Sequence, residues 1–232
     1  MESILLPNKI QFTRSERPNE GVLVVEPCAK GYGTTLGNAL RRVLLSSLSG
    51  AAITSVKIKG ANHEFATLPN VKEDMLEIIL ALKSVRLKLH SDEPVKLTLS
   101  VSGEKKITAS DFDKNAQVEI VTPDAPIATL TDASGSLEME AWVSPGQGYE
   151  TAEERGGEKA EIGMIGIDAL YSPILNVSYK VEATRVGEKT DFDKLILNVE
   201  TDGTIDPVEA VNHSVNILTE YVGVLKDLTY TE

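Results

Sequence analysis

The apolar residues of the chain recur with helical spacing in three stretches and alternate with polar residues in most of the others. Residues 21–26 form an apolar run that predicts a buried strand, and a glycine-bearing turn at residues 31–37 follows it. The next segment is predicted to be the first helix, ending near Ser49-Gly50. The apolar residues that share one face of this helix are Leu36, Ala39, Leu40, Val43, Leu44 and Leu48.

A second helix is predicted over residues 71–83. Asn70 and Glu73 have the spacing of a capping pair at a helix N-terminus. The apolar residues along one side of this helix, enough to pack against a sheet, are Val71, Met75, Ile78, Ile79 and Leu82.

Between residues 85 and 143 the apolar positions alternate in short runs separated by Gly, Asp, Asn and Pro, which is typical of strands joined by turns. Two further alternating runs, 177–183 and 195–199, predict strands, and Asp202-Gly203 predicts a turn. The charged, glycine-bearing stretch from Glu150 to Glu161 is expected to be a mobile surface loop.

The last helix has the clearest start signal of the chain. Asp206 is suited to cap it, Pro207 to occupy the first helical position, and Glu209 to bond back to the cap. Positions with the a/d spacing of a two-helix seam are Val208, Val211, Val215, Leu218, Val222 and Leu225. A second apolar stripe beside them comprises Ala210, Ile217, Tyr221, Val224 and Leu228.

This apolar face is wider than a helix lying on one side of a domain needs. About 22 residues make a helix of roughly 33 Å, about the width of a small domain. One face can cover the sheet of its own domain, and we expect the other to pair with the same helix of a second copy through a two-fold axis. The alternative is a helix wrapped entirely by its own chain.

Composition narrows the functional classes. The chain has 232 residues, 41% of them hydrophobic, which suits one large domain or two small ones. Its formal net charge of −12 disfavours direct binding of nucleic acid. The single Cys28 and three scattered histidines predict neither a disulfide nor a zinc site. Because no apolar run approaches the ~18 residues of a membrane span, we expect a cytoplasmic protein without membrane contact.

An enzyme is the alternative from another class. A strand, the Gly31–Gly37 turn and a helix together resemble a phosphate or nucleotide site, but the glycine spacing departs from the dinucleotide fingerprint. Asp191 and Asp193 are spaced to share a metal ion along a strand, yet no phosphate-loop lysine or third carboxylate accompanies them. Glycines that shape a turn and solvated or capping aspartates are the favoured interpretations.

The first helix has an unusual second side, because Arg41 and Arg42 lie one turn before Leu45, which is off the main apolar stripe. A leucine beside guanidinium groups is typical of a protein contact. A solvated arginine pair with a stray leucine is the equally weighted alternative.

The segment from Gly31 to Ser47, Gly-Tyr-Gly-Thr-Thr-Leu-Gly-Asn-Ala-Leu-Arg-Arg-Val-Leu-Leu-Ser-Ser, closely resembles the signature of the α subunit family of bacterial-type RNA polymerase. The resemblance recurs, in order, at residues 63–65, 71–80, 168–173, 181–185, 190–195 and 201–207. Seven matching segments in sequence make the family assignment specific.

The resemblance implies an α+β fold with a discontinuous dimerisation domain, an antiparallel sheet with two main helices, formed by residues 1–48 plus 174–232. A β-rich domain, residues 49–173, is inserted and contacts the large polymerase subunits. Two copies are expected to form a homodimer that scaffolds assembly of the β and β′ subunits. The chain itself is expected to be non-catalytic and without cofactors, since magnesium and zinc belong to the large subunits in this family.

By matched position, the resemblance implies three interfaces. The predicted β-subunit interface comprises Asn38, Arg41, Arg42 and Leu45. The predicted β′-subunit interface comprises Lys83 and Ile167. The predicted dimer interface comprises Leu36, Leu40, Val211, Val215, Leu218, Val222 and Leu225.

The chain departs from the family pattern at Pro145 and at Leu175-Asn176, where basic residues are usual. We expect these departures to affect contacts with the large subunits rather than the dimer. The family continues into a linker and a small DNA-binding domain, to which no segment of these residues corresponds. A plastid origin stays open beside a bacterial one.

Overall fold

The computed structural model describes residues 4–155 and 163–227, which divide into two compact units. The two-part unit comprises residues 1–48 and 172–232, and the inserted unit comprises residues 49–171. Both combine α-helices with antiparallel sheets, which confirms the α+β class.

The second border between the units lies two residues earlier than the sequence analysis placed it. Ser172 Oγ donates to the carbonyl oxygen of Leu45 at 3.5 Å, and the backbone N–H of Asp202 donates to the carbonyl oxygen of Pro173 at 3.0 Å. These hydrogen bonds tie residues 172 and 173 to the two-part unit.

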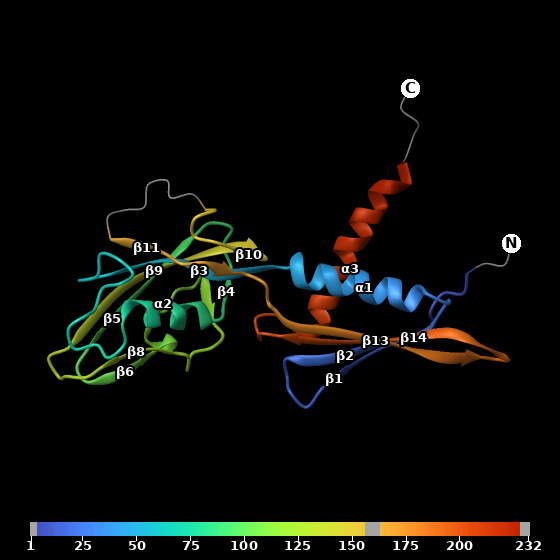
Figure 1. Ribbon diagram of the computed structural model, residues 1–232, viewed down its shortest axis with the longest axis horizontal. Helices are drawn as coiled ribbons and strands as arrows, with labels where there is room; N and C mark the ends of the chain where they lie inside the picture. Colours follow the sequence, from blue (N-terminus) through green and yellow to red (C-terminus); the bar gives the residue numbers. More distant parts are fainter. Residues whose placement is uncertain (1–3, 156–162, 228–232) are drawn as a thin grey trace, which may run out of the picture. The chain divides into compact units, whose positions relative to one another are not determined.

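The two-part unit is built on a four-stranded antiparallel sheet in the order β1-β2-β14-β13. Helix α1 lies along one face of this sheet, and α3 crosses α1 (Figure 1). Leu44, Leu195 and Leu197 are fully buried between helix and sheet. The elements are β1 (Lys9–Arg14), β2 (Glu20–Cys28), α1 (Tyr32–Ser46), β13 (Ile174–Val186), β14 (Lys189–Thr201) and α3 (Pro207–Val224).

The glycines before and within α1 do more than shape a turn. Of the glycines in this turn, Gly31 has the left-handed backbone, with φ 84°, and α1 begins directly after it at Tyr32, four residues before Leu36, the first apolar residue of the predicted helix. Gly33 and Gly37 lie inside the helix against the sheet, where a Cβ on Gly37 would sit 2.6 Å from Tyr179 Cδ2. The glycines therefore let the helix backbone approach the sheet closely.

Helix α3 begins at the predicted residues, but within the described part of the chain Glu209 does not form the predicted bond back to the Asp206 amide. The Asp206 side chain accepts a hydrogen bond from Val208 N at 2.9 Å, and Pro207 occupies the first turn. The α-helix ends at Val224, and one 3₁₀ turn, Leu225–Asp227, follows it.

The inserted unit packs α2 against a four-stranded antiparallel sheet in the order β11-β3-β9-β5, with smaller two-stranded pairs around them. Met75, Ile78 and Leu82 on α2 are fully buried. The elements are β3 (Ser49–Ile58), α2 (Met75–Ser84), β4 (Leu87–Leu89), β5 (Val95–Ser102), β6 (Lys105–Thr108), β7 (Val118–Ile120), β8 (Pro126–Leu130), β9 (Ser136–Gln147), β10 (Tyr149–Glu150), β11 (Met164–Gly166) and β12 (Ala169–Leu170).

The predicted start of α2 was wrong by one turn. Its capping box is Asp74 with Glu77: Glu77 N donates to Asp74 Oδ1 at 2.8 Å, and Asp74 N donates to Glu77 Oε2 at 3.3 Å. Asn70 instead has a left-handed backbone, with φ 60°. Glu73 accepts hydrogen bonds from the amide and hydroxyl of Thr129, so its carboxylate is occupied elsewhere.

Candidate protein interaction sites

The N-terminus of α1 is already occupied by a carboxylate of the same chain. Asp193 Oδ2 accepts hydrogen bonds from Gly31 N at 2.8 Å and Gly33 N at 3.2 Å. These amides are the groups that would bind a phosphate. The structure therefore gives no support to the alternative of a phosphate site at residues 31–37.

Asp193 is likewise a capping residue rather than half of a metal-binding pair with Asp191. Within residues 4–155 and 163–227, no cluster of three or more His, Cys, Asp or Glu is placed to hold a metal ion. Burial raises the pKa of the Cys28 thiol, with the nearby Asp193 charge as a second cause, so this cysteine is held as a neutral core residue.

The outward side of α1 carries the residues predicted to contact β. Asn38, Arg42 and Leu45 are exposed and lie four and three residues apart, so they share one stripe of the helix. Arg41 differs from them, because its Nε donates to the carbonyl oxygen of Val177 at 3.1 Å and ties α1 to β13. The guanidinium of Arg42, in contrast to that of Arg41, forms no hydrogen bond or ion pair within the described part of the chain.

The two residues predicted to contact β′ differ in accessibility. Lys83, at the end of α2, pairs its Nζ with Asp168 Oδ2 at 2.9 Å, and each side chain is 34% exposed. Ile167 is 1% exposed, and its backbone N–H donates to the carbonyl oxygen of Thr54 at 2.8 Å. The side chain of Ile167 therefore belongs to the core, and its neighbour Asp168 is the residue that reaches the surface beside Lys83.

Residues 151–155 form an ordered turn, although the sequence predicts a mobile loop over residues 150–161; residues 156–161 of that loop lie outside the described residues. Thr151 N donates to Glu154 Oε2 at 3.0 Å, and Glu154 N donates to Thr151 Oγ1 at 3.2 Å. The hydrogen bond that the carboxylate accepts from the Thr151 amide, and after it one from the Thr151 side chain, lowers the pKa of Glu154. Thr-x-x-Glu is the capping-box spacing, so the signal was present in the sequence.

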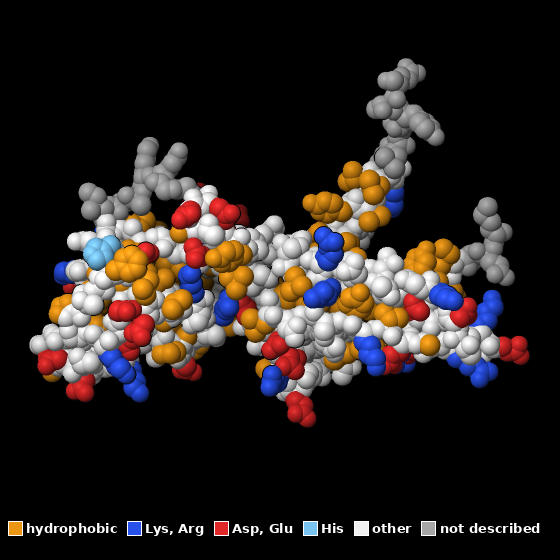
Figure 2. Space-filling model, viewed as in Figure 1, with side chains coloured by type: hydrophobic (Ala, Val, Ile, Leu, Met, Phe, Trp, Pro, Cys, Tyr) orange, Lys and Arg blue, Asp and Glu red, His pale blue; other side chains and the backbone are white. Residues whose placement is uncertain are grey.

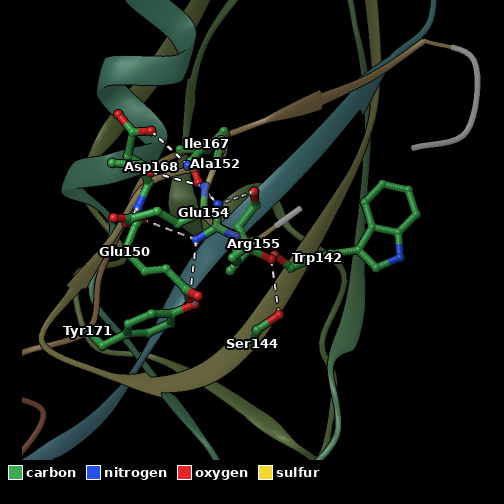
Figure 3. A network of polar contacts seen from close by, with 11 residues as sticks. Trp142, Ser144, Glu150, Ala152, Glu154, Arg155, Ile167, Asp168 and Tyr171 are labelled. Atoms are coloured by element: carbon green, nitrogen blue, oxygen red, sulfur yellow. Dashed lines mark hydrogen bonds and ion pairs between the residues drawn. The ribbon is translucent and has the colours of Figure 1, made fainter. Parts of the chain in front are cut away.

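The turn directs Arg155 inward (Figure 3). Its Nη2 donates to the carbonyl oxygens of Thr54, at 3.1 Å, and Ile167, and its Nη1 donates to that of Glu150 at 3.4 Å. Close by, the hydroxyl of Tyr171 donates to Glu150 Oε2 at 3.3 Å, and burial raises the pKa of this phenol. Arg155 is thus a partly buried polar centre of the inserted unit.

Asp168 joins this turn to α2. Its Oδ1 accepts a hydrogen bond from Ala152 N at 3.0 Å, while its Oδ2 holds Lys83. The hydrogen bond from Lys83, and after it the one from the Ala152 amide, lowers the pKa of Asp168. Beside this pair, Tyr149 and Leu170 face each other in the β10–β12 pair and are exposed. Apolar groups around an ion pair are suited to a protein contact.

The predicted dimer face divides into a covered and an exposed part. Leu40 and Val211 are buried in the core of their own unit, and Leu218 is half-buried. These residues already pack within the chain, because α3 crosses α1 there. Exposed large apolar side chains on α1 are Tyr32, Leu36 and Leu45, of which Leu45 belongs to the stripe predicted to contact β. Those on α3 and the 3₁₀ turn after it are Val215, Tyr221, Val222, Val224 and Leu225. Figure 2 shows hydrophobic side chains gathered on the part of α3 that extends away from the sheet.

None of the helices formed by the described residues is both long and apolar enough to cross a membrane.

Comparison with known proteins identifies the family. A model of the RNA polymerase Rpb3/RpoA insert domain matches residues 56–172. The DNA-directed RNA polymerase subunit alpha of Desulforamulus reducens is 51% identical over 224 residues, which are 96% of this chain and 71% of that protein. The protein of the same name from Symbiobacterium thermophilum is 51% identical over 215 residues, 93% of this chain and 68% of that protein. The one from Moorella thermoacetica is 52% identical over 209 residues, 90% and 66% of the two chains.

These likenesses span both units of the fold, and the match to the insert-domain model falls almost entirely on the inserted unit. The chain therefore belongs to the family of DNA-directed RNA polymerase α subunits.

Proposed function

We propose that this chain is a non-catalytic assembly subunit of a DNA-directed RNA polymerase, in which two copies pair and the pair holds the β and β′ subunits. Its relatives at about half identity are named as polymerase α subunits, which supports this role. In this proposal the nucleotidyl transfer, with its metal ions, belongs to the large subunits. The net charge of −12 makes the chain a poor ligand for DNA by itself and suits a scaffold.

The observation that carries the dimer is an apolar stripe on α3 that continues beyond the core of its own unit. Val211 and Leu218 lie seven residues apart and so share one side of α3, and Leu225, seven residues further on, begins the 3₁₀ turn that follows the helix. Val211 is 6% exposed, Leu218 is half-buried, and Leu225 is 58% exposed. The same side therefore packs on α1 at one end and projects into solvent at the other.

A second copy is the partner that this stripe favours. Exposed apolar side chains at this density mark interaction sites rather than ordinary surface. A two-fold axis would bring the exposed part of each α3 against the other copy, and Leu36 on α1 supplies exposed apolar surface in the same unit. The dimer face of the proposal is the exposed set Leu36, Val215, Tyr221, Val222, Val224 and Leu225, without the buried Leu40 and Val211.

The stripe of Asn38, Arg42 and Leu45 is the proposed contact for β. An exposed leucine can fill an apolar pocket of the partner, and the unengaged guanidinium of Arg42 can form a forked pair with a carboxylate. The proposed contact for β′ is the surface around Lys83, with Asp168 in place of the buried Ile167. The bacterial relatives make the cytoplasm the compartment of this proposal, and none of them supports a plastid origin.

The test of this function is the molar mass of the purified chain by light scattering over a dilution series, followed by capture of purified β and β′. A mass near twice 25.1 kDa and capture of both large subunits are expected. A dimer that captures neither large subunit contradicts the assembly role.

A further inference from the structure

Arg155 draws together backbone groups from three separate stretches of the inserted unit. Its guanidinium donates to the carbonyl oxygens of Thr54 on β3, Ile167 before β12, and Glu150 on β10. Only 19% of its side chain is exposed. Thr54 is itself fixed, because its Oγ1 donates to the carbonyl oxygen of Trp142 on β9 at 3.2 Å (Figure 3). The guanidinium therefore bonds to a rigid part of the sheet.

The turn that carries Arg155 reaches Lys83 through one intermediate. Ala152 N donates to Asp168 Oδ1, and Asp168 Oδ2 accepts the ammonium of Lys83. Each carboxylate oxygen thus has its own partner, one from the turn and one from α2. Together with the Tyr149 side chain, which is a further donor to this carboxylate, the Ala152 bond sets the orientation of Asp168 and, through it, the position of the Lys83 ammonium.

We propose that Arg155 is a positioning residue for the β′ contact: it holds the turn of residues 151–155 against β3 and Ile167, and the turn holds Asp168 and Lys83 in the arrangement that β′ meets. The inference rests on the proposed contact of Lys83 with β′. The hydrogen bonds of Nη1 and Nη2 go to carbonyl oxygens of the same unit, so in this proposal Arg155 acts on β′ through the turn and not through a contact of its own.

Arginine is the side chain suited to this task. Its planar guanidinium has five N–H donors in fixed directions, so it can bond to three carbonyl oxygens from different segments at once. A lysine ammonium at the same place keeps the charge but presents its donors from a single point. The arrangement therefore depends on the shape of the arginine group as well as on its charge.

The experiment compares the wild-type dimer with Arg155→Ala, Lys83→Ala and the double variant for capture of purified β′, with capture of β as the internal control. Arg155→Ala should weaken β′ capture roughly tenfold, as expected for coupled residues of one network, and leave β capture and the dimer mass unchanged. The double variant should capture β′ as Lys83→Ala alone does, because Arg155 acts through Lys83. Hydrogen exchange at residue 152 should be faster in Arg155→Ala.

The outcomes separate the inference from the function on which it rests. If Lys83→Ala weakens β′ capture and Arg155→Ala does not, the positioning role is wrong and the β′ contact stands. Additive losses in the double variant also overturn the positioning role. If Lys83→Ala itself captures β′ normally, the proposed β′ surface fails, and the inference fails with it.

Arg155→Lys is a second variant that distinguishes the loss of the positioning contacts from a loss of folding. Its thermal midpoint should lie closer to that of the wild type than the midpoint of Arg155→Ala does. The amide of residue 152 should still exchange faster than in the wild type, and β′ capture should lie between those of the wild type and Arg155→Ala. Full β′ capture by Arg155→Lys together with fast exchange would contradict the proposal.

Discussion

The carboxylate of Asp193 accepts the backbone N–H of Gly31 at 2.8 Å, so that β14 supplies the cap for a helix 162 residues earlier in the chain. The helix N-terminus favours a negative charge, and the same oxygen also satisfies Gly33 N. This contact fixes α1, with its proposed β-contact stripe, on the sheet of the two-part unit.

Asp193→Ala should therefore lower the free energy of unfolding of the two-part unit by about 1–2 kcal/mol, because two helix amides lose their acceptor. The measurement is denaturant unfolding followed by circular dichroism. Asp191→Ala removes an exposed carboxylate on the same strand and should change stability by less than about 0.5 kcal/mol. Equal losses in the two variants would contradict the capping role.

Gly37→Ala should destabilise the chain although alanine is the better helix former. The added Cβ would lie 2.6 Å from Tyr179 Cδ2 and 2.9 Å from Leu195 Cδ1, and such overpacking costs about 1–3 kcal/mol. Gly223→Ala is the matched control in α3, where nothing lies within 4 Å of the new Cβ, and it should gain up to about 1 kcal/mol. Thermal unfolding of both variants checks the opposite signs.

Val222→Glu should convert the proposed dimer to monomers. Val222 is exposed in the single chain, so the fold tolerates the charge, whereas an apolar interface would bury it at a cost of several kcal/mol. Light scattering over a dilution series measures the effect. Asn216→Glu places the same charge on the polar side of α3 and should leave the molar mass of the wild type. A dimer of unchanged affinity in Val222→Glu would exclude this stretch of α3 from the interface.

Arg42→Ala should weaken capture of β without changing the dimer or the stability of the chain, because its exposed guanidinium forms no hydrogen bond or ion pair within the described residues. Arg41→Ala should instead act mainly on stability. It should lower the free energy of unfolding by about 1 kcal/mol, since Arg41 Nε bonds to the Val177 carbonyl oxygen, and should change β capture less than Arg42→Ala does. Pull-down of β by each variant, beside its denaturant midpoint, distinguishes the two arginines. Normal β capture by Arg42→Ala would remove Arg42 from the proposed interface.

The Lys83–Asp168 pair predicts a pH dependence of the inserted unit. The pKa of Asp168 is lowered in the folded state, chiefly by the hydrogen bond from Lys83. Its stabilising contribution is therefore fully present above the ordinary pKa near 3.8, and it is lost as the pH falls through the lower folded-state pKa. The difference in unfolding free energy between wild type and Asp168→Asn should be constant from pH 7 to about 5 and shrink below about 4. Lys83→Met should reduce the same acid-range loss, and a pH-independent difference would contradict the assignment.

Local sequence signals are sufficient to predict several elements of this fold without any tertiary contact. The start of α3 follows from Asp206 and Pro207, because a cap and a restricted φ act within a few residues of each other. The alternating runs at 177–183 and 195–199 became β13 and β14, because period-two burial needs only one covered face. The short or edge strands β1, β6, β8, β10, β11 and β12 carried too little pattern to be predicted.

Tertiary structure decided between local signals of equal strength. Asn70 with Glu73 and Asp74 with Glu77 have the same capping spacing. The left-handed backbone of Asn70 and the hydrogen bonds of Glu73 with Thr129 leave Asp74 as the cap. Ile167 matched a contact position, yet its place over Thr54 buries it and leaves Asp168 at the surface. The carbonyl oxygens that Arg155 meets come from residues up to 101 positions away, so no local pattern could name them.

The sequence by itself determined which residues of α3 share a face, since helical spacing is a property of the backbone. It did not determine which of them a partner can reach. Val211 and Leu225 are equivalent by heptad spacing. Val211 is buried against the core of its unit, whereas Leu225 lies beyond the end of that core and is exposed. Burial depends on where the neighbouring elements stop, and only the assembled unit sets that limit.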